Sequence, residues 1–226
     1  MNAAAATAAY LLDLPGLTPY GEALELMKNL AGARSQQAIP DTLILLEHEP
    51  IVTLGTRTDV ASEIPHPALL EQRGIPVVEV ARGGRATYHG PGQLVGYPIF
   101  DLAPLGRDLR RYVESLEAAL IGALDDLGVA AEAREAEEHT GVWVGERKIA
   151  SIGVHVASWI TTHGFALNVD CDLEPFDLFV GCGLQESRYT TAAIEAGRTI
   201  GRDEASAAVL HHLGEQFGRT WEALPR

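Results

Sequence analysis

The feature that most constrains the fold of this 226-residue chain is a series of short β-prone runs that turns connect. These runs, rich in Val, Ile, Leu and Phe, lie at 10–14, 43–47, 51–54, 77–80, 93–100, 142–156 and 165–169. Pro50 separates the second run from the third, because proline cannot donate to a β ladder. Gly145-Glu146 interrupts the run at 142–156 as in a hairpin. Strands joined by short turns favour antiparallel pairing.

Apolar residues recur at helical spacing in three longer stretches, 20–32, 107–127 and 203–221. No internal repeat or low-complexity linker divides the chain. We therefore expect an α+β fold in which residues 1–226 form a single domain, with helices packed on one mixed, mostly antiparallel sheet. The alanine-rich residues 1–8 are expected to be disordered.

The charge balance, 31 acidic against 17 basic side chains, argues against a nonspecific nucleic-acid binder, because phosphate contacts need a concentrated basic field. The two cysteines, Cys171 and Cys182, are too few for a disulfide framework and lack zinc-ligand spacing. The first basic residue is Lys28, and the apolar opening is shorter than the ~20 residues that cross a bilayer. These features predict a cytoplasmic protein that binds neither nucleic acid nor membrane.

A glycine-rich segment between two predicted strands is the densest unusual feature of the sequence. It reads Arg82-Gly83-Gly84-Arg85-Ala86-Thr87-Tyr88-His89-Gly90-Pro91-Gly92-Gln93. Its glycines let a backbone approach a ligand closely. On composition alone, the segment is as compatible with a flexible hairpin connection that carries solvated arginines. It matches neither the phosphate-binding loop nor the dinucleotide-binding glycine motif, so we do not expect it to bind a nucleotide.

Cys182 and Lys148 are candidate catalytic residues. Cys182 lies between two glycines, which leave the thiol accessible and backbone N–H groups free for an oxyanion, although a buried inert cysteine is the commoner case. Cys171 has an acidic neighbour on each side that suppresses its thiolate. Lys148 begins a predicted strand; it favours a nearby thiolate if it lies inside the sheet, or points to water if the strand is an edge.

The glycine-rich segment and the residues after it resemble the signature of the octanoyltransferases of lipoate biosynthesis, also called lipoyl(octanoyl) transferases. The matching positions are Arg82, Gly83, Gly84, Thr87, Tyr88, His89, Gly92, Gln93 and Tyr97. Residues 148–153, Lys-Ile-Ala-Ser-Ile-Gly, resemble the lysine strand of that family, and Gly181-Cys182-Gly183 resembles its nucleophile loop.

This resemblance implies a fold similar to the catalytic domain of lipoate and biotin protein ligases, which encloses an acyl tunnel. It implies that Cys182 and Lys148 form a catalytic dyad, with His89 in the same pocket. The implied substrate-binding residues are Arg82, Gly83, Gly84, Arg85, Ala86, Thr87, Tyr88, His89, Ser151, Ile152, Gly153, Gly164, Phe165 and Ala166.

The reaction implied by the resemblance is the first step of endogenous protein lipoylation, without a cofactor or a metal. An octanoyl group moves from octanoyl-acyl carrier protein to the target lysine of apo lipoyl domains, which belong to the E2 subunits of 2-oxoacid dehydrogenases and to the glycine cleavage H protein. In the mechanism that we expect, the Lys148 ammonium stabilises a Cys182 thiolate, which attacks the octanoyl thioester. The acceptor lysine then attacks the acyl-enzyme, and Lys148 removes the proton of its amine.

Three alternatives to this mechanism stay open. An ATP-using lipoate or biotin ligase has a similar scaffold and does not need the cysteine. A non-enzymatic module would bind carrier or lipoyl domains without turnover. A thioester hydrolase would use Cys182 and His89 and release octanoate to water.

Two further expectations concern basic and imidazole side chains. Because the carrier protein is acidic like this chain, docking needs a local basic patch, for which the candidates are Arg57, Arg82, Arg85, Arg107, Arg110 and Arg111. The other histidines are expected to be structural rather than metal ligands: His48, His66, His211 and His212 in loops or on a helix face, and His139, His155 and His163 nearer the site in sequence.

Overall fold

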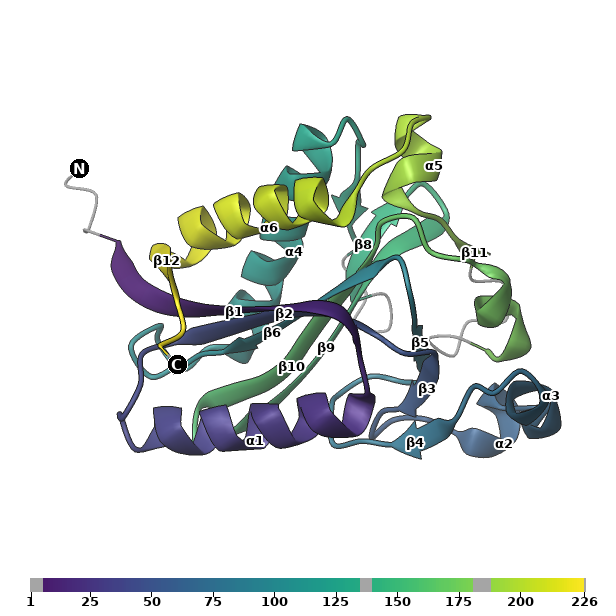
Figure 1. Cartoon of the computed structure of the whole chain (residues 1–226), viewed down its shortest axis with the longest axis horizontal. Coiled ribbons are helices and arrows are strands. Elements are labelled where there is room, and N and C mark those ends of the chain that lie inside the picture. The colour runs from purple at the N-terminus through teal and green to yellow at the C-terminus, as the bar shows by residue number, and fades with distance from the viewer. Residues whose placement is uncertain (1–5, 135–139, 181–187, 226) are drawn as a thin grey trace.

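The computed structural model of the chain describes residues 6–134, 140–180 and 188–225 and contains two β-sheets with helices around them (Figure 1). The described strands of the main sheet follow the order β12-β1-β2-β6-β10-β9-β8-β7, and β11 pairs with β9. Their bounds are β1 Thr7–Thr18, β2 Thr42–His48, β6 Gln93–Ile99, β7 Glu132–Ala133, β8 Gly141–Val144, β9 Arg147–Ala157, β10 Ile160–Asn168, β11 Arg188–Tyr189 and β12 Arg219–Ala223. β1 runs parallel to β2 and β12, and β11 runs parallel to β9, whereas the remaining pairs are antiparallel. The expected mixed, mostly antiparallel sheet is confirmed.

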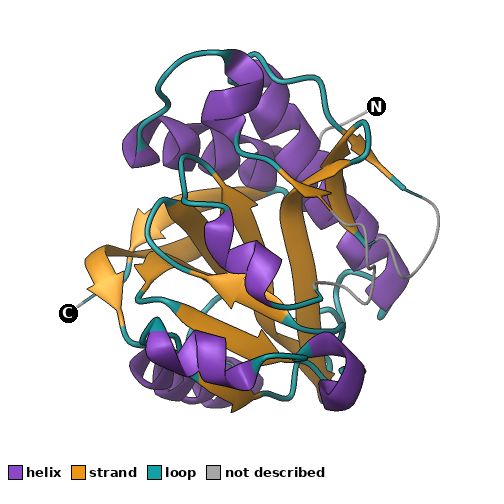
Figure 2. Ribbon diagram, turned by 90° about the vertical axis from the view of Figure 1, so that its right-hand side faces the viewer, coloured by secondary structure: helices purple, strands orange, loops and turns teal. Residues whose placement is uncertain are grey.

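The centre of the main sheet is buried on both faces, because its strands carry apolar residues on both sides. Successive side chains of β2 alternate, so Leu43 and Leu45 face one core and Ile44 and Leu46 face another. The first core also holds residues of α4 (Leu109–Asp126) and α6 (Arg202–Phe217), and the second holds residues of α1 (Tyr20–Ser35). Figure 2 shows the strands between an upper and a lower layer of helices.

The sequence-based expectation of one sheet is wrong, because a second, three-stranded sheet lies beside the main one. It has the order β4-β3-β5, formed by β3 (Ile51–Leu54), β4 (Val77–Glu79) and β5 (Thr87–His89). The break predicted at Pro50 is the place where the chain leaves the main sheet. A third core forms between this sheet, α3 (Pro67–Gln72) and the 3₁₀ helix η2 (Glu174–Leu178), and the short helix α2 (Val60–Glu63) ends just before its member Ile64. The remaining helix, α5 (Ala192–Ala196), follows β11.

The C-terminal helix is shorter than predicted. α6 ends at Phe217, because Gly218 adopts a left-handed backbone with φ 60°, and the chain then forms β12 instead of continuing as helix to Trp221. β12 pairs in parallel with the beginning of β1. Thr7 and Ala8 therefore belong to a strand, which corrects the expectation that residues 1–8 are disordered.

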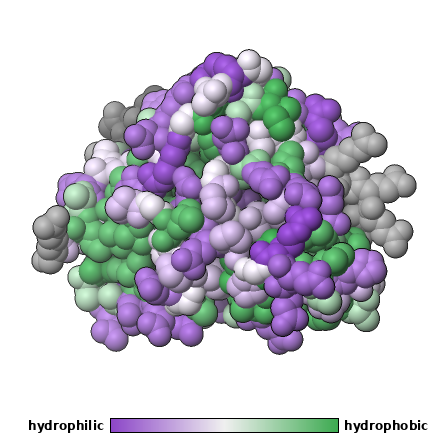
Figure 3. Space-filling model, turned by 45° about the vertical axis from the view of Figure 1, so that its right-hand side comes forward, coloured by the Kyte–Doolittle hydropathy of each residue, from purple (hydrophilic) through white to green (hydrophobic). Residues whose placement is uncertain are grey.

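The exposed large hydrophobic side chains of the described residues are spread over the molecule. They belong to six different elements or turns: Leu17, Val60, Leu69, Leu109, Trp159 and Ile194. On the face drawn in Figure 3, hydrophobic patches are separated by hydrophilic residues. None of the helices in the described part of the chain is long and apolar enough to span a bilayer.

Candidate active site

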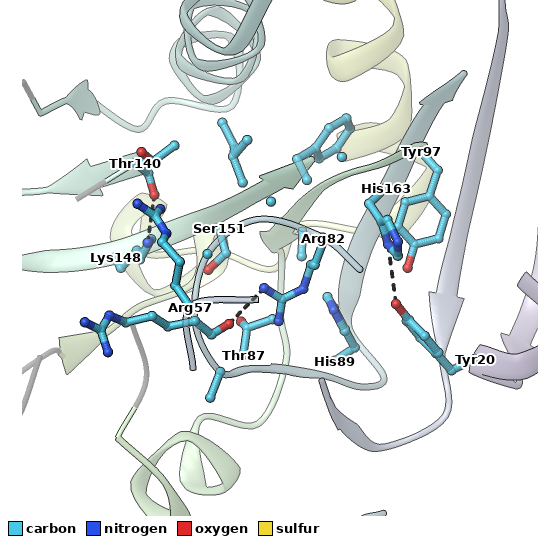
Figure 4. A pocket seen from close by; sticks show the side chains of 18 residues that line it. Tyr20, Arg57, Arg82, Thr87, His89, Tyr97, Thr140, Lys148, Ser151 and His163 are labelled. Carbon is cyan, nitrogen blue, oxygen red and sulfur yellow. Dashed lines mark hydrogen bonds between the residues drawn. The ribbon is translucent and has the colours of Figure 1, made fainter. Parts of the chain in front are cut away.

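A pocket of about 180 Å³ is lined by residues from both sheets, chiefly β5, β9 and β10 (Figure 4). It brings together most of the residues that the sequence singled out: Arg82, Gly84, Arg85, Ala86, Thr87, His89, Lys148, Ser151, Ile152, Gly153, Gly164, Phe165 and Ala166. Gly83 and Tyr88 are not among the lining residues. The Gly83 N–H donates to the Val154 carbonyl at 2.9 Å, and the Tyr88 ring packs edge-on against Phe176 in the third core. Cys182 lies in segment 181–187, outside the described residues.

Lys148 is buried at one end of the pocket, with 2% of the residue exposed. It lies inside the sheet, because β9 is flanked here by β8 and β11, so the alternative of an edge lysine that points to water is wrong. Its Nζ donates to the Thr140 carbonyl oxygen at 2.9 Å and lies 5.2 Å from the centroid of the Trp143 ring. A carbonyl oxygen and an aromatic face are both surroundings that suit a cation.

Gly141 leaves the space that the Lys148 side chain occupies. A Cβ atom at Gly141 would lie 2.8 Å from Lys148 Cε, and the φ of Gly141 is 130°, which side-chain-bearing residues rarely adopt. The Gly141 N–H donates at 2.9 Å to the carboxyl group of Glu117 on α4. Burial raises the pKa of Glu117, whereas the charge of Lys148 lowers it. The sheet and α4 therefore place an acid close to the buried ammonium.

Arg82 is a buried cation in the pocket wall, with 6% of the residue exposed. Its Nη2 donates to the carbonyl and hydroxyl oxygens of Thr53 at 2.7 Å each, and its Nη1 donates to the carbonyls of Gly83 and Arg85 at 3.1 and 2.8 Å. These bonds hold the glycine-rich segment against β3. A buried guanidinium cannot form part of an exposed docking patch, so Arg82 is removed from the candidates for that role.

The end of the pocket opposite Lys148 contains a cluster of phenol and imidazole rings (Figure 4). Its members are Tyr20, His89, Tyr97 and His163, which line the pocket, and His48, which does not, with neighbouring ring centroids 5.2 to 6.3 Å apart. Burial lowers the pKa of His48 and His163 to about 4, and it lowers the pKa of His89 well below its usual value. The positive charge of Arg82 adds to the effect at His89 and His163. These histidines are therefore uncharged at neutral pH.

Sequence reasoning missed part of this ring cluster. His48 was expected in a loop or on a helix face, but it is the last residue of β2 and is fully buried. Its Nδ1 lies 2.8 Å from the Thr18 carbonyl oxygen, and its Nε2 lies 2.7 Å from Tyr97 Oη. The signal was strand alternation: His48 follows Ile44 and Leu46 at a period of two and thus faces the same side. His163, expected to be structural, also lines the pocket.

The described residues on either side of segment 181–187 make contacts that lead to the pocket. The Val180 N–H donates to the carbonyl oxygen of Glu63 at 2.8 Å, and the buried Glu63 carboxylate accepts the N–H of Ala86 at 3.1 Å. Just after the segment, Tyr189 pairs with Lys148 in the β11–β9 ladder. The structure therefore brings the residues on either side of the segment to the pocket wall and to the lysine strand.

The remaining candidate groups lie away from this chemistry. Burial, with a smaller contribution from its acidic neighbours, raises the pKa of Cys171 to about 12, which agrees with the expected suppression of its thiolate. Of the other histidines, His66 precedes α3, His155 lies in β9, His211 and His212 lie in α6, and His139 falls outside the described residues. Within the described ranges, no group of three or more His, Cys, Asp or Glu side chains is placed to hold a metal ion.

Comparison with known proteins relates the chain to enzymes that handle lipoyl groups. The model of the lipoyl protein ligase A/B catalytic domain matches residues 19–214. An octanoyltransferase of Solibacter usitatus is 45% identical over 210 residues, which cover 93% of each chain. A crystal structure of lipoate-protein ligase A bound with ATP gives a TM-score of 0.79 at 20% identity and covers 96% of this chain and 89% of that one.

Two more solved structures share the fold at lower identity. A bipartite lipoate protein ligase of Thermoplasma acidophilum, described with its E2 lipoyl domain, gives a TM-score of 0.72 at 18% identity and covers 98% of this chain and 87% of that one. A biotin protein ligase of Aquifex aeolicus in complex with biotin and ATP gives 0.51 at 17% identity, with 74% and 69% covered. The expected likeness to lipoate and biotin ligase catalytic domains is confirmed for the fold. With a family match over most of its length and octanoyltransferase relatives above 40% identity, the chain belongs to the lipoyl protein ligase A/B catalytic-domain family, among its octanoyltransferases, and is an acyltransferase of protein lipoylation.

Proposed function

We propose that this acyltransferase moves an octanoyl group from octanoyl-acyl carrier protein to the target lysine of apo lipoyl domains, with the acyl group held on Cys182 between the two steps. The acceptors would be E2 subunits of 2-oxoacid dehydrogenases and the glycine cleavage H protein. The names of the sequence relatives and the lipoyl domain described with the Thermoplasma acidophilum ligase support this proposal. We also propose a cytoplasmic reaction, where reduced thiols such as that of Cys171 persist.

The observation that carries the proposal is the buried ammonium group of Lys148 at the pocket. Lys148 pairs with Tyr189, which follows segment 181–187 in the chain, and Val180, which precedes that segment, donates its N–H to the Glu63 carbonyl oxygen. A cation beside a thiol favours its thiolate, which is the nucleophilic form. Because Gly181-Cys182-Gly183 resembles the nucleophile loop of the family, we assign Cys182 as the thiol whose thiolate Lys148 stabilises.

The proposed chemistry consists of two acyl transfers. The Cys182 thiolate attacks the octanoyl carbonyl carbon, a new C–S bond forms, and the bond to the carrier thiol breaks. The lysine amine of the lipoyl domain then attacks the same carbon, the C–S bond to Cys182 breaks, and an amide forms. The first exchange replaces one thioester with another, and the second replaces a thioester with a more stable amide. The two transfers therefore proceed without activation of the acyl group by a nucleotide.

The apolar part of the pocket suits the hydrocarbon tail. Ile152, Phe165 and Ala166 contribute apolar side chains to its lining, on neighbouring strands β9 and β10. Each methylene of an acyl chain that leaves water for such surroundings contributes about 0.8 kcal/mol. The tail of an octanoyl group therefore supplies several kcal/mol of binding free energy, enough to discriminate against much shorter chains.

With Arg82 removed from the candidates, we place the docking patch for the carrier protein at the pocket itself. Arg57 and Arg85 both line the pocket, Arg57 is exposed, and 41% of the Arg85 side chain is exposed. An acidic carrier protein that delivers its acyl chain here would meet these guanidinium groups, although the chain as a whole carries a net charge of -14.

The proposal is tested by locating the acyl group. The protein is incubated with octanoyl-acyl carrier protein, digested and examined by mass spectrometry. We expect one octanoyl group on the peptide that contains Cys182 and none on the peptide that contains Cys171, and the label should disappear when an apo lipoyl domain is added. An unlabelled Cys182, or pyrophosphate release from ATP and free octanoate, would overturn the covalent scheme; free octanoate without acylated lipoyl domain would instead identify a hydrolase.

Lys148→Met provides a second test, because it keeps the length of the side chain and removes the charge. We expect octanoyl transfer to fall by about 10²-fold or more, since the thiolate loses its cationic partner. Lys28→Met, at the chain's other lysine and on the exposed side of α1, should leave the rate unchanged. A Lys148→Met protein that is folded and transfers octanoyl at the normal rate would contradict the assignment of this lysine.

A further inference from the structure

A chain of buried side chains leads from His89 away from the pocket. His89 Nδ1 lies 2.8 Å from Gln93 Oε1, Gln93 Nε2 lies 2.9 Å from Asn168 Oδ1, and Asn168 Nδ2 lies 3.0 Å from the Thr190 carbonyl oxygen. None of the four residues is more than 6% exposed. The Thr190 N–H in turn donates to the Lys148 carbonyl oxygen at 3.1 Å, so this series of hydrogen bonds ends at β9, the strand that carries Lys148.

The direction of these hydrogen bonds follows from the carbonyl groups at which they end. A backbone carbonyl can only accept, so the Thr190 carbonyl takes the amide N–H of Asn168 and leaves Asn168 Oδ1 to accept from Gln93 Nε2. The same Gln93 Nε2 also donates to the Tyr88 carbonyl at 3.3 Å. Both contacts orient the Gln93 amide with Oε1 toward His89. The ring must therefore donate from Nδ1, which assigns its proton to that nitrogen.

The second ring nitrogen of His89, Nε2, is then an unprotonated acceptor. The rings of Tyr20 from α1 and His48 from β2 pack against the His89 ring. Burial lowers the pKa of His89 most, and His48, Arg82 and His163 lower it further against the opposing hydrogen bond to Gln93, so the imidazole is uncharged at neutral pH. Within the described lining there is no carboxylate, and its Arg and Lys side chains can only donate. Figure 4 shows His89 between Arg82 and Tyr20, among the side chains that line the pocket.

We propose that Gln93 and Asn168 are positioning residues that hold His89 with its proton on Nδ1, so that Nε2 receives the proton of the acceptor amine. This inference rests on the proposed transfer to a lysine. As the amine nitrogen bonds to the acyl carbon and the C–S bond breaks, Cys182 regains its thiolate and one N–H proton passes to Nε2. In this scheme Lys148, whose Nζ contacts a carbonyl oxygen and an aromatic face, keeps its charge during the transfer.

The first part of the test measures the tautomer of His89 in the whole protein. Histidine labelled with ¹⁵N gives a different two-bond correlation pattern for each tautomer, and the His89→Gln variant identifies the signals of this ring. We expect the Nδ1–H pattern in the unmodified protein and its loss in Gln93→Met. An Nε2–H pattern, or a ring that stays charged at neutral pH, would overturn the inference without affecting the proposed octanoyl transfer.

The second part separates positioning from general stability. Starting from octanoyl-Cys182 enzyme, we expect Gln93→Met to lower the rate of transfer to the lipoyl domain by about 10²-fold with little change in KM, because the amine loses its proton acceptor. His89→Gln should cost about as much, and the double variant should cost no more than either, since Gln93 acts through His89. Gln216→Met, the same change on an exposed position of α6, should have no effect. Losses that multiply in the double variant, or a Gln93→Met enzyme with normal transfer, would overturn the positioning role.

The acylation step and the fold serve as internal controls. Release of carrier thiol from octanoyl-acyl carrier protein should continue in Gln93→Met, because the proposed proton transfer belongs to the second step. Thermal unfolding of each variant shows whether it is folded. If the unmodified protein fails to acylate Cys182, the proposed function fails, whereas the tautomer measurement still decides the arrangement of His89, Gln93 and Asn168.

Discussion

Burial decides the protonation of individual side chains at the pocket. His48 is fully buried, and its Nδ1 faces the Thr18 carbonyl, so the ring donates there and accepts the Tyr97 hydroxyl proton at Nε2. Burial also raises the pKa of Tyr20 to about 12, which keeps this phenol protonated. The rings of the cluster are therefore neutral, whereas Arg82 beside them carries a permanent positive charge.

The buried neutral histidines predict a pH dependence of stability. Because the pKa of His48 is about 4 in the folded protein against an ordinary value of 6.5, the unfolded chain binds a proton more readily, and the free energy of unfolding falls as the pH drops from 6.5 to 4. Such a shift corresponds to a contribution on the order of 3 kcal/mol. We expect His48→Gln, which keeps donor and acceptor atoms, to lose less stability over this range in urea unfolding. Equal losses in both proteins would contradict the low pKa of His48.

At the scale of elements, the local pattern predicted helices and strands well but not their partners. The amphipathic stripe of α4 and the strand break at Pro50 depend on neighbouring residues in the chain, so the sequence contains their signal. The assignment of β3 and β5 to a separate sheet, and of β12 to the edge of β1, depends on pairing between distant segments. Nothing in a single strand's alternation specifies such a partner.

The same distinction applies to the candidate site. The glycine-rich segment and the strand that begins near Lys148 were visible as motifs, and the structure brings both to one pocket. Tyr20 gave no sequence signal, because it reaches the pocket only through the packing of α1 on the main sheet. The sequence also did not show that Arg82 is buried. Composition alone does not distinguish a solvated arginine from one whose guanidinium group donates to the Thr53 carbonyl oxygen.

The close approach of β10 and β6 at Gly164 predicts a strong effect of one added methyl group. A Cβ atom at Gly164 would collide with the backbone oxygen of Gly96 and lie 2.6 Å from Pro98 Cδ, and neither backbone nor proline ring can yield easily. We expect Gly164→Ala to lower the free energy of unfolding by about 1–3 kcal/mol. Gly21→Ala in α1, where no atom lies within 4 Å, should be neutral or slightly stabilising. Chemical denaturation measures both, and equal stabilities would contradict the tight contact.

At the scale of the whole molecule, one buried carboxylate links segments that are far apart in sequence. Asp41, which is 4% exposed, accepts from Arg34 of α1 at 2.8 Å and from Arg219 of β12 at 2.6 Å. It also accepts the backbone N–H of Asp101 at 3.0 Å. One side chain thus joins the first long helix, the segment that follows β6 and the last strand of the main sheet.

Removing this charge should destabilise the molecule more than removing an exposed one. Asp41→Asn removes the carboxylate that two largely buried guanidinium groups share, although Arg34 keeps a second, longer ion pair with Asp101 at 3.5 Å, and we expect a loss of about 3 kcal/mol in the free energy of unfolding. Glu114→Gln, which breaks the exposed pair with Arg110 on α4, should change it by less than about 1 kcal/mol. Urea unfolding at neutral pH compares the two, and similar losses would show that Asp41 does not join these segments.

The parallel pairing of β12 with β1 has a consequence for synthesis on the ribosome. β12 is made after every other described strand, so nascent β1 keeps an open edge while nearly the whole chain is translated. At about 5–20 residues per second this interval lasts tens of seconds, during which the edge is available to other nascent chains. Slower translation or a shortage of chaperones should therefore lower the yield of folded protein, and covering this edge should matter more for production in cells than for the stability of the finished fold.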